Sequence, residues 1–518
     1  MKIIYILILS FLFSAAEAQT WSWAKSVSSN GPDKGNSITY DDAGNIYVAA
    51  DFYTNFGPIV IADSTITDNA LIKYSKTGTI IWALNVNGSV TDITTDASGN
   101  IYLTGLFENT AQFGDSVFTS LGQADVFVAK VNPAGKFIWA KHAGGTGYDD
   151  CYAIAVGTDS NLVIAAFPGS SIIIDDTTIN LGGGVLLIDY NLNGNFIWAK
   201  QEGYNNRAFG IAIDSDNNIL VAGYFSFSSD FGGGTIIPGN GNYSAAFIAK
   251  YNSTGGFVWA KTGISAGDNS AQGLVLDNMN NAYITGYFED TIDLGNNINL
   301  ISNTSMKDIF IAKYNSSGQT QWANRDGTWD IDIANSIALQ GNHVFITGFM
   351  GIDYPAINDV FVKAYDLNGN YVMSVRIDST DNNSANAIAA DDDGNVYITG
   401  QFQNTLEFNN TLSLTSYASN DYDFFVAKLI PVYSPQDILQ LNDKYCISIY
   451  PNPATDNISI VLSEDIKDYQ ISLINALGQT MLQTQSTKVD VSSIPDGLYF
   501  LSIKSDQGEF NKRVIICR

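Results

Sequence analysis

A phrase of ten residues recurs along the chain and constrains its fold more than any other feature. The copy at 393–402 reads DGNVYITGQF, and close variants include SGNIYLTGLF (98–107) and MNNAYITGYF (279–288). An apolar anchor precedes each of the seven copies, at intervals of 51 to 63 residues: Ile38, Ile93, Ile154, Ile211, Leu274, Ile337 and Ile388. Self-similarity at such a period predicts a repeat architecture in which every repeat is one small structural unit.

Each repeat contains four short stretches rich in Val, Ile, Tyr, Phe and Thr and bounded by Gly, Asn and Asp, which is typical of β-strands. In the fourth repeat these stretches are FGIAI (209–213), NILVAGYF (218–225), AAFIAKY (245–251) and GFVWAK (256–261). A four-stranded sheet of this kind has two apolar faces, and stacking sheets around an axis buries both. The sequence therefore predicts an all-β chain with a seven-bladed β-propeller.

The count of strands predicts how the propeller closes. A Trp-Ala pair marks the fourth strand at Trp23, Trp82, Trp139, Trp198, Trp259 and Trp322. The chain opens with such a strand at 21–25, and the repeats end with a third strand at 423–428 that has no fourth strand after it. We expect the N-terminal strand to complete the seventh blade and to join the two ends of the ring.

The repeat resembles the bacterial β-propeller repeat called SBBP. The segment NAIAADDDGNVYITG (386–400) follows the family pattern of Ala-Ile-Ala-x-Asp, Gly-Asn and Tyr-Val-Thr-Gly. The resemblance covers about residues 21–430. It implies the propeller fold but no particular activity, because the family is defined by its repeat.

The first eighteen residues are typical of a signal peptide. Lys2 precedes the apolar run IIYILILSFLF (3–13), and AEA (16–18) is a small-residue cleavage pattern. We expect the mature chain to begin at Gln19, a propeller over 19–430, a linker over 431–445 and a small β-sandwich over 446–518. No later run approaches the roughly 18 apolar residues of a membrane helix.

The last segment resembles the type A C-terminal sorting domain of the Bacteroidetes type IX secretion system. The resemblance rests on Tyr450, Pro451, Asn452, Pro453, Gly478, Gly497, Tyr499, Lys512 and Arg513. It implies that the type IX machinery is a partner, and that the domain is removed when the protein is released or attached to the outer cell surface. Release and attachment both stay open, and an ordinary adhesive sandwich is the alternative.

Charge and cysteine content narrow the possible partners. The chain has 52 Asp and Glu against 25 Lys and Arg, a net charge of −27 that would repel nucleic acids. Three cysteines are too few for a disulfide scaffold. Cys446 and Cys517 stand at opposite ends of the sorting segment and are open to pairing, whereas Cys151 is expected to be a buried thiol.

The sequence offers no clear catalytic constellation. His142 and His343 are the two histidines, they stand in different repeats, and no Ser, Cys or carboxylate set recurs beside them. We therefore expect a non-catalytic protein. The alternative is an extracellular polysaccharide hydrolase or lyase that uses paired carboxylates, for which 147–154 and 329–335 are the nearest departures from the repeat.

Two polar positions recur with the repeat. Three residues after the anchor stand Asp41, Asp96, Asp214, Asp277 and Asp391, which we interpret as turn residues bonded to their own backbone. Five residues before the anchor stand Asp33, Asp149, Asn206, Asn269, Asp332 and Asn383. We expect this second set to ring the mouth of the central channel. There the six side chains would either bind Ca²⁺ or, as we favour, bind backbone N–H groups of the same or the next blade.

Long connections between second and third strands, such as 108–125 and 289–308, are expected to form extra hairpins on the face of the channel mouth. Aromatic side chains near this face suit stacking on sugars: Tyr148, Tyr204, Phe227, Tyr243 and Trp329. The alternative is that these aromatic side chains pack between blades. The sequence thus predicts a secreted or cell-surface binding or adhesion protein for a polysaccharide or a matrix protein, with a structural surface-layer component as a further possibility.

Overall fold

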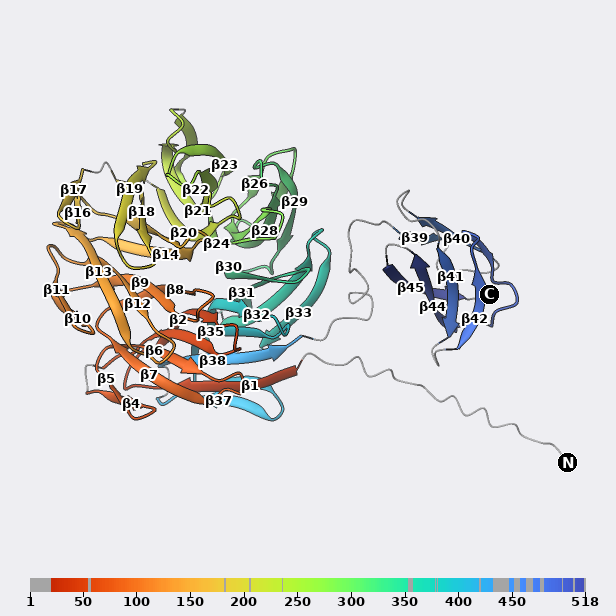
Figure 1. Cartoon of the computed structure of the whole chain (residues 1–518), viewed down its shortest axis with the longest axis horizontal. Helices are drawn as coiled ribbons and strands as arrows, with labels where there is room; N and C mark the ends of the chain where they lie inside the picture. The colour runs from red at the N-terminus through yellow and green to blue at the C-terminus, as the bar shows by residue number, and fades with distance from the viewer. Residues whose placement is uncertain are drawn as a thin grey trace. The chain divides into compact units, whose positions relative to one another are not determined.

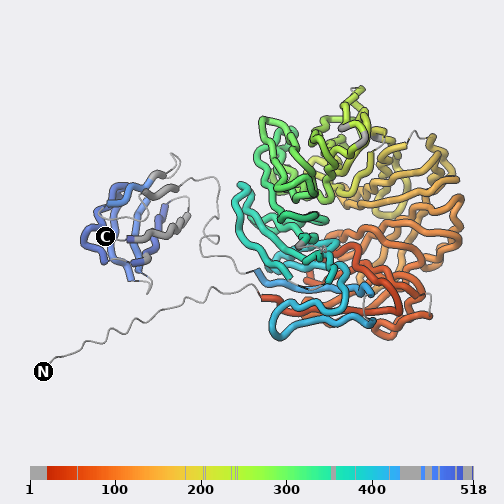
Figure 2. The backbone as a smooth tube through the Cα atoms, turned by 180° about the vertical axis from the view of Figure 1, so that it is seen from behind, coloured from red at the N-terminus to blue at the C-terminus, as the bar shows by residue number. Residues whose placement is uncertain are grey.

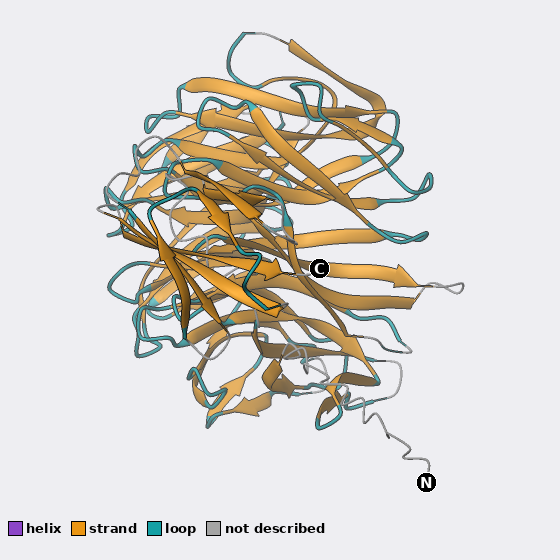
Figure 3. Cartoon of the chain, turned by 90° about the vertical axis from the view of Figure 1, so that its right-hand side faces the viewer, coloured by secondary structure: helices purple, strands orange, loops and turns teal. Residues whose placement is uncertain are grey.

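The structure is a computed structural model of the 518-residue chain. It describes residues 20–54, 57–180, 183–204, 206–234, 236–352, 357–377, 379, 381–418, 421–431, 447–450, 457–462, 469–475, 479–495, 497–505 and 508–516. The chain divides into two compact units, Met1–Pro431 and Val432–Arg518. Every regular element among the described residues is a β-strand (Figure 3). The predicted signal peptide (1–18), Gln19 and the predicted linker after Pro431 lie outside the described residues.

Seven four-stranded antiparallel groups make up the first unit, and we number them sheets 1 to 7 (Figure 1). Their first strands are β2 (Lys34–Tyr40), β8 (Ser89–Thr95), β14 (Asp150–Val156), β20 (Asn206–Ile213), β24 (Asn269–Leu276), β30 (Asp332–Gln340) and β34 (Ser384–Ala390). Their second strands are β3 (Ile46–Asp51), β9 (Ile101–Phe107), β15 (Asn161–Phe167), β21 (Ile219–Asp230), β25 (Ala282–Phe288), β31 (His343–Ile352) and β35 (Val396–Gln403).

The outer two strands of each sheet follow in chain order. The third strands are β6 (Asn69–Tyr74), β12 (Asp125–Val131), β18 (Val185–Asn191), β22 (Ile236–Tyr251), β28 (Asp308–Tyr314), β32 (Ile357–Asp366) and β38 (Tyr422–Ile430). The fourth strands are β7 (Ile80–Val86), β13 (Phe137–Gly145), β19 (Phe196–Glu202), β23 (Phe257–Ser265), β29 (Thr320–Asp326), β33 (Tyr371–Ile377) and β1 (Thr20–Val27).

The sheets succeed one another around a common centre. The first strand of each sheet contacts the first strand of the next, and β34 of sheet 7 contacts β2 of sheet 1. Seen from behind, the chain colours follow one another in order around this centre (Figure 2). The first strands are therefore innermost, as expected from the repeat.

The N-terminal strand belongs to the last sheet. Strand β1 pairs antiparallel with β38, from Thr20 opposite Ile430 to Val27 opposite Phe424. Just after β1, the Ser28 hydroxyl donates a hydrogen bond of 2.7 Å to Asp423. The predicted pairing of the two ends of the repeat region is confirmed.

The core lies between neighbouring sheets rather than within any one of them. Ile38, Val48 and Ile72 of sheet 1 share a buried cluster with Tyr397 and Val426 of sheet 7. Further clusters join sheets 1 and 2, 2 and 3, 3 and 4, 4 and 5, and 5 and 6. Each sheet is thus held by apolar contacts with its neighbours in the chain.

The fourth-strand tryptophans add a specific bond at these junctions. The Trp82 indole Nε1 donates to the Pro133 carbonyl in the next sheet at 3.1 Å, and Trp139 donates to Leu192 at 3.1 Å. The same bond recurs from Trp23, Trp259 and Trp322. The indole of Trp82 also covers Gly135, which has φ of 78°, and a Cβ there would lie 2.9 Å from the ring. The turn therefore requires glycine for both its conformation and its contact.

The aspartates three residues after the anchor act as turn residues, as predicted. Asp41 accepts hydrogen bonds from the backbone N–H groups of Ala43 and Asn45 at 3.1 and 2.8 Å. It also accepts from the Tyr47 hydroxyl at 2.8 Å and lies 3.7 Å from the Lys73 ammonium. Burial alone would raise the pKa of Asp41, but these donors outweigh it and leave the pKa below the usual value.

Five connections between second and third strands form the extra hairpins that the sequence predicted. They are β4 (Ile59–Ile61) with β5 (Ser64–Ile66), β10 (Thr110–Phe113) with β11 (Ser116–Thr119), β16 (Ile172–Ile174) with β17 (Thr177–Ile179), β26 (Thr291–Asp293) with β27 (Asn299–Ile301), and β36 (Thr405–Asn409) with β37 (Leu412–Thr415). Strand β16 pairs with β13 and β26 pairs with β23, so these two hairpins extend the preceding sheets to six strands.

The second unit contains two sheets around one core. One sheet is β39 (Ile447–Tyr450), β40 (Asn457–Leu462) and β43 (Lys488–Asp490). The other is β42 (Thr480–Thr484), β41 (Gln470–Asn475), β44 (Gly497–Ser505) and β45 (Gly508–Ile516). Ile458 and Val489 of the first sheet share a buried cluster with Ile471, Leu473 and Leu501 of the second, which is the arrangement of a β-sandwich.

Only part of the predicted sorting motif falls within the described residues of this unit. Tyr450 ends β39, Gly497 begins β44, and the Tyr499 hydroxyl donates a 2.8 Å hydrogen bond to the Pro495 carbonyl. The backbone of Lys512 and Arg513 lies in β45. Pro451, Asn452, Pro453, Gly478, Cys446 and Cys517 lie outside the described residues.

The pairing of β1 with β38 predicts that residues of β1 contribute to the stability of the first unit. Replacing Trp23, which is buried between sheets 7 and 1, by Ala should destabilise the first unit by about 3–5 kcal/mol. All eight tryptophans precede residue 330, so tryptophan fluorescence during denaturant unfolding reports this unit alone. The exposed neighbour in Ser22→Ala should change the unfolding free energy by less than about 0.5 kcal/mol. Equal unfolding free energies of Trp23→Ala and the native chain would show that Trp23 does not stabilise the first unit.

Candidate functional site

The six polar residues five positions before the anchors are buried at the start of the first strands or just before it. All are at most 1% exposed. In each, a side-chain oxygen accepts a backbone N–H at 2.6 to 3.0 Å, from Tyr53, Gly169, Val185, Ala246, Gly351 and Gln403 in chain order. The backbone-binding interpretation is therefore confirmed. Four of these donors lie at the end of the second strand of the same sheet, and two, Val185 and Ala246, lie on the third strand of the preceding sheet. The six side chains are thus buried and bonded to backbone rather than open to a channel mouth.

A backbone N–H group already bonds a side-chain oxygen at each of these positions, and Ca²⁺ binding there stays a prediction. Among the described residues, no group of three or more His, Cys, Asp or Glu side chains is arranged to hold a metal ion. Burial raises the pKa of Asp332 to about 7 and that of Asp33 to about 6, in spite of the N–H donors that lower it. These carboxyls are thus structural groups that titrate near neutral pH.

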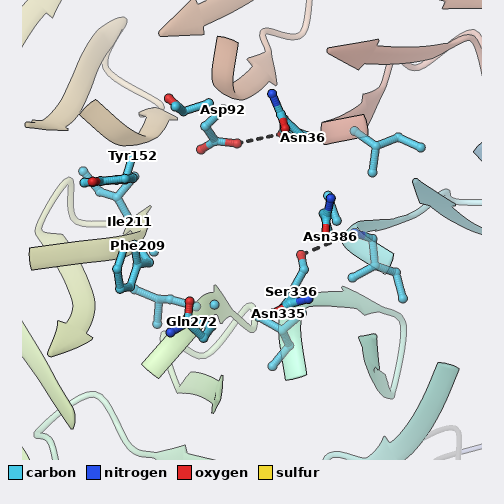
Figure 4. Close-up of a pocket in the computed structure, with 18 residues that line it drawn as sticks. Asn36, Asp92, Tyr152, Phe209, Ile211, Gln272, Asn335, Ser336 and Asn386 are labelled. Atoms are coloured by element: carbon cyan, nitrogen blue, oxygen red, sulfur yellow. Dashed lines mark hydrogen bonds between the residues drawn. The ribbon is translucent and has the colours of Figure 1, made fainter. Parts of the chain in front are cut away.

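A different ring of side chains faces the centre. In all seven first strands the pairing with the second strand skips the residue two positions before the anchor. The skipped residues, which we call the bulge ring, are Asn36, Thr91, Tyr152, Phe209, Gln272, Asn335 and Asn386. A β-bulge redirects a side chain, and here it directs one side chain per sheet into the central space (Figure 4).

Two cavities meet at the bulge ring. The inner cavity has a volume of about 260 Å³, and the ring is joined there by anchor residues such as Ile38, Ile211 and Leu274. The outer cavity has a volume of about 500 Å³ and extends to Lys34, Ser89 and Gln401. Ligand sites commonly measure about 300–1,000 Å³, so the outer cavity has the size of a small-ligand site, with a smaller cavity behind it.

Four members of the ring bind the next sheet. The side-chain amides of Asn36, Asn335 and Asn386 each donate a 2.9 Å hydrogen bond to a carbonyl, that of Val90, Ala385 and Gly35 respectively. The Thr91 hydroxyl donates to the Cys151 carbonyl in the same way at 2.5 Å. A carbonyl oxygen can only accept a hydrogen bond, so each amide must turn its nitrogen toward the carbonyl of the next sheet. The amide oxygens can then accept hydrogen bonds from other partners. This half of the ring is therefore rigid and rich in acceptors.

The other half of the ring is aromatic. Tyr152 and Phe209 meet edge to face with centroids 5.1 Å apart, and Gln272 follows on the next sheet (Figure 4). Arg207 supports this pair, because its Nη1 donates to the Tyr152 hydroxyl at 3.2 Å and its guanidinium lies 4.4 Å from the Phe167 ring centroid. Gln272 donates only to its near neighbour Ser270, at 3.0 Å. These side chains present ring faces and an amide to the cavity.

Asp92 is the one acidic residue that lines either cavity. It accepts hydrogen bonds from the Ser37 hydroxyl at 2.8 Å and from the N–H groups of Ile93 and Ile154 at 2.9 and 3.0 Å. It therefore ties three successive sheets together. Burial raises its pKa to about 6 against the effect of these donors. Its oxygens are occupied, so Asp92 is placed to hold the ring rather than to act on a ligand.

The remaining candidates for chemistry have structural partners. His142 lies 2.9 Å from Asp125, at the register where Arg325 and Arg376 pair with Asp308 and Asp359 in other sheets. His142 thus takes the place that an arginine holds in the corresponding pairs of other sheets. Cys151 is fully buried, and burial raises the pKa of its thiol to about 12, as expected for an inert cysteine.

The five aromatic side chains singled out from the sequence are exposed, by 44% for Tyr148 up to 81% for Trp329. The alternative that they pack between sheets is wrong. Tyr148, Tyr204 and Trp329 lie on connections from fourth to first strands, and the exposed Tyr53 and Tyr417 lie on connections from second to third strands. Phe227 and Tyr243 lie on the paired extension of β21 and β22, beyond the length of the other second and third strands. In an antiparallel sheet these connections share one end of the strands. Lys34 and Ser89, at the outer cavity, lie at that same end.

The bulge ring was not predicted from the sequence, because the predicted sites were residues that recur from repeat to repeat. Its members share a position but no chemistry, since they are asparagine, threonine, tyrosine, phenylalanine and glutamine. The signal that was available is this variation itself. It falls at one fixed point of an otherwise regular repeat.

Comparison with known proteins identifies the C-terminal segment. Residues 448–517 match the family model of the secretion system C-terminal sorting domain. An uncharacterized WD repeat-containing protein of Acanthamoeba polyphaga mimivirus is 25% identical over 58% of this chain and 27% of its own length. The chain thus spans about a quarter of that relative.

Several solved structures are similar at low identity. The Pan2 WD40 domain of Neurospora crassa covers 80% of this chain and 96% of its own, with 8% identity and a TM-score of 0.44. The WD40 β-propeller domain of Doa1 covers 81% and 98%, with 10% identity and a TM-score of 0.42. A Bacteroides caccae protein of unknown function covers 59% and 89%, with 10% identity and a TM-score of 0.34.

The raised pKa of Asp332 predicts a pH effect. A carboxyl with a higher pKa in the folded chain binds protons on folding, so its contribution to stability falls as pH rises from about 4 through about 7. Asn occupies the same position in sheets 4, 5 and 7. The Asp332→Asn variant should therefore fold. The difference between its unfolding free energies at pH 5 and pH 8 should be at least about 1 kcal/mol smaller than that of the native chain.

Denaturant unfolding across this pH range measures the effect. Asp42→Asn removes an exposed carboxyl and serves as the matched control. A pH dependence of Asp332→Asn as steep as that of the control would show that Asp332 is ionised throughout.

Proposed function

We propose that the chain is a secreted or cell-surface, non-catalytic binding or adhesion protein whose first unit is a closed seven-bladed β-propeller of SBBP type. The observation that carries the proposal is the distribution of aromatic side chains. Seven exposed rings lie at one end of the sheets, five on connections and two on the paired extension of β21 and β22, and Lys34 and Ser89 of the outer cavity lie at that same end. Exposed aromatics on loops of a rigid scaffold are typical of binding surfaces.

A polysaccharide or a surface or matrix protein suits this face. Its contacts are rings, amides and hydroxyls, and the charged Lys34 at the opening is already 3.5 Å from Asp51. The net charge of −27 disfavours polyanions. We expect no bound cofactor in this function, with Ca²⁺ left to a direct binding measurement.

The rival function is cleavage of a polysaccharide. Glycoside hydrolysis ordinarily needs two carboxyl groups about 5–9.5 Å apart. The residues that line the two cavities include one carboxylate, Asp92, and three hydrogen bonds occupy it. The repeated aspartates elsewhere are bonded to their own turns. The binding function therefore accounts for more of the structure than catalysis does.

The sorting domain match implies export by the type IX secretion machinery to the cell surface or the medium. No helix among the described residues is long and apolar enough to cross a bilayer. We propose that residues 1–18 direct the chain across the inner membrane and are removed there. Residues 446–518 would then direct it across the outer membrane and be removed on release or attachment.

Binding by the aromatic face is tested with Trp329→Ala and Tyr204→Ala in the purified chain. Each removes a ring exposed by more than half and should weaken binding to the polysaccharides or matrix proteins that the native chain retains by at least about fivefold, or 1 kcal/mol. Tyr371→Ala is the matched control, because Tyr371 is 61% exposed at the opposite end of a fourth strand. Sugar release without retention would instead favour the hydrolase.

Export is tested in a host that carries type IX machinery. The chain ending at Pro431 should remain in the periplasm, whereas the complete chain should reach the surface or medium. Immunoblots of the cell fractions distinguish the two. Surface delivery of the shortened chain would contradict the role of the sorting domain, provided that its tryptophan fluorescence shows a folded first unit.

A further inference from the structure

The bulge ring is enclosed on every side by protein. Its seven residues come from seven different sheets, and their first strands contact one another in sequence, with β34 beside β2. A polymer cannot lie across such a ring from the side. It reaches the inner cavity only along the central axis, with one end leading.

The two halves of the ring have complementary chemistry. One half presents the side-chain oxygens of Asn36 and Asn335, fixed by the bonds that their nitrogens make to the next sheet. The other half presents the rings of Tyr152 and Phe209. A pyranose has hydroxyl donors around its edge and C–H groups on its faces, so it satisfies amide oxygens and stacks on aromatic rings at the same time.

The charges at the ring favour a neutral sugar. Asp92 is occupied by three donors, Arg207 is engaged by Tyr152 and Phe167, and Lys34 is paired with Asp51. Each of these cations already has a carboxylate or an aromatic ring beside it, so none is left to pair with an anionic sugar. A cationic group would find one carboxylate whose oxygens already accept hydrogen bonds.

We propose that the bulge ring binds the terminal residue of a neutral polysaccharide, which enters end first, while the rest of the chain runs outward over the exposed aromatic side chains. The proposal rests on the binding function above and deepens it. The outer cavity of about 500 Å³ holds the leading sugar, and the inner cavity of about 260 Å³ lies behind it. The protein would thus recognise chain ends rather than chain interiors.

The test compares ligands that have ends with ligands that lack them. Calorimetry of the complete purified chain would use linear hexasaccharides of neutral glucans, mannans and xylans, with a cyclic glucose hexamer as the matched ligand for linear α-1,4-glucose hexasaccharide. Neutral polysaccharides would also be cut with endo-glycanases at constant mass. We expect the bound amount to rise in proportion to the number of chain ends, and a linear hexasaccharide to bind at least tenfold more tightly than a cyclic one.

Two variants connect this behaviour to the ring. Phe209→Ala and Gln272→Ala remove side chains that make no bond to the backbone of another sheet, and each should weaken hexasaccharide binding at least tenfold. Trp329→Ala should instead weaken the long polymer more than the hexasaccharide. Binding that follows polymer mass, or hexasaccharide binding unchanged in both ring variants, would overturn end recognition and leave the binding face standing. Absence of binding to every neutral sugar and matrix protein would overturn both.

Discussion

The burial of both faces of every sheet is the constraint on which the rest of the first unit depends. A four-stranded sheet with apolar side chains on each face is stable only between two others, and the buried clusters here each draw on two neighbouring sheets. Sheets 1 and 7 are neighbours in space, although they come from opposite ends of the repeat region. The pairing of β1 with β38 and the contacts of Trp23 with Tyr74 and Tyr397 join those ends.

The same constraint separates structural residues from residues free to bind. A side chain that recurs in every sheet meets the same surroundings each time, and the aspartates of the turns, the tryptophans of the junctions and the buried Asp and Asn residues all serve those surroundings. The bulged position differs. Its side chain leaves the sheet and faces the centre, so the fold fixes where it points but not what it is. Variation at Phe209 or Gln272 changes the cavity without removing a hydrogen bond to another sheet.

The fold was largely predictable because its determinants are local and repeated. Strand patterns, turn residues such as Asp41, the hairpins between second and third strands, and the missing fourth strand of the last repeat are all visible in the sequence. The exposed aromatics, including Trp329, were also identified. The polar residues before the anchors were placed at the correct end of the strands, but Asp149 and its counterparts are buried, and hydrogen bonds from backbone N–H groups of the same or the preceding sheet compensate that burial.

The sequence by itself determined the repeat, the strand order and the sorting domain, since each depends on residues close together in the chain. Only the tertiary structure decided which side chains meet at the centre. Asn36 and Asn386 are 350 positions apart in the chain, yet both line one cavity, and the Asn386 amide binds the Gly35 carbonyl. A bulge is a register shift between two strands. Its direction therefore follows from pairing across the sheet and cannot be derived from a single strand.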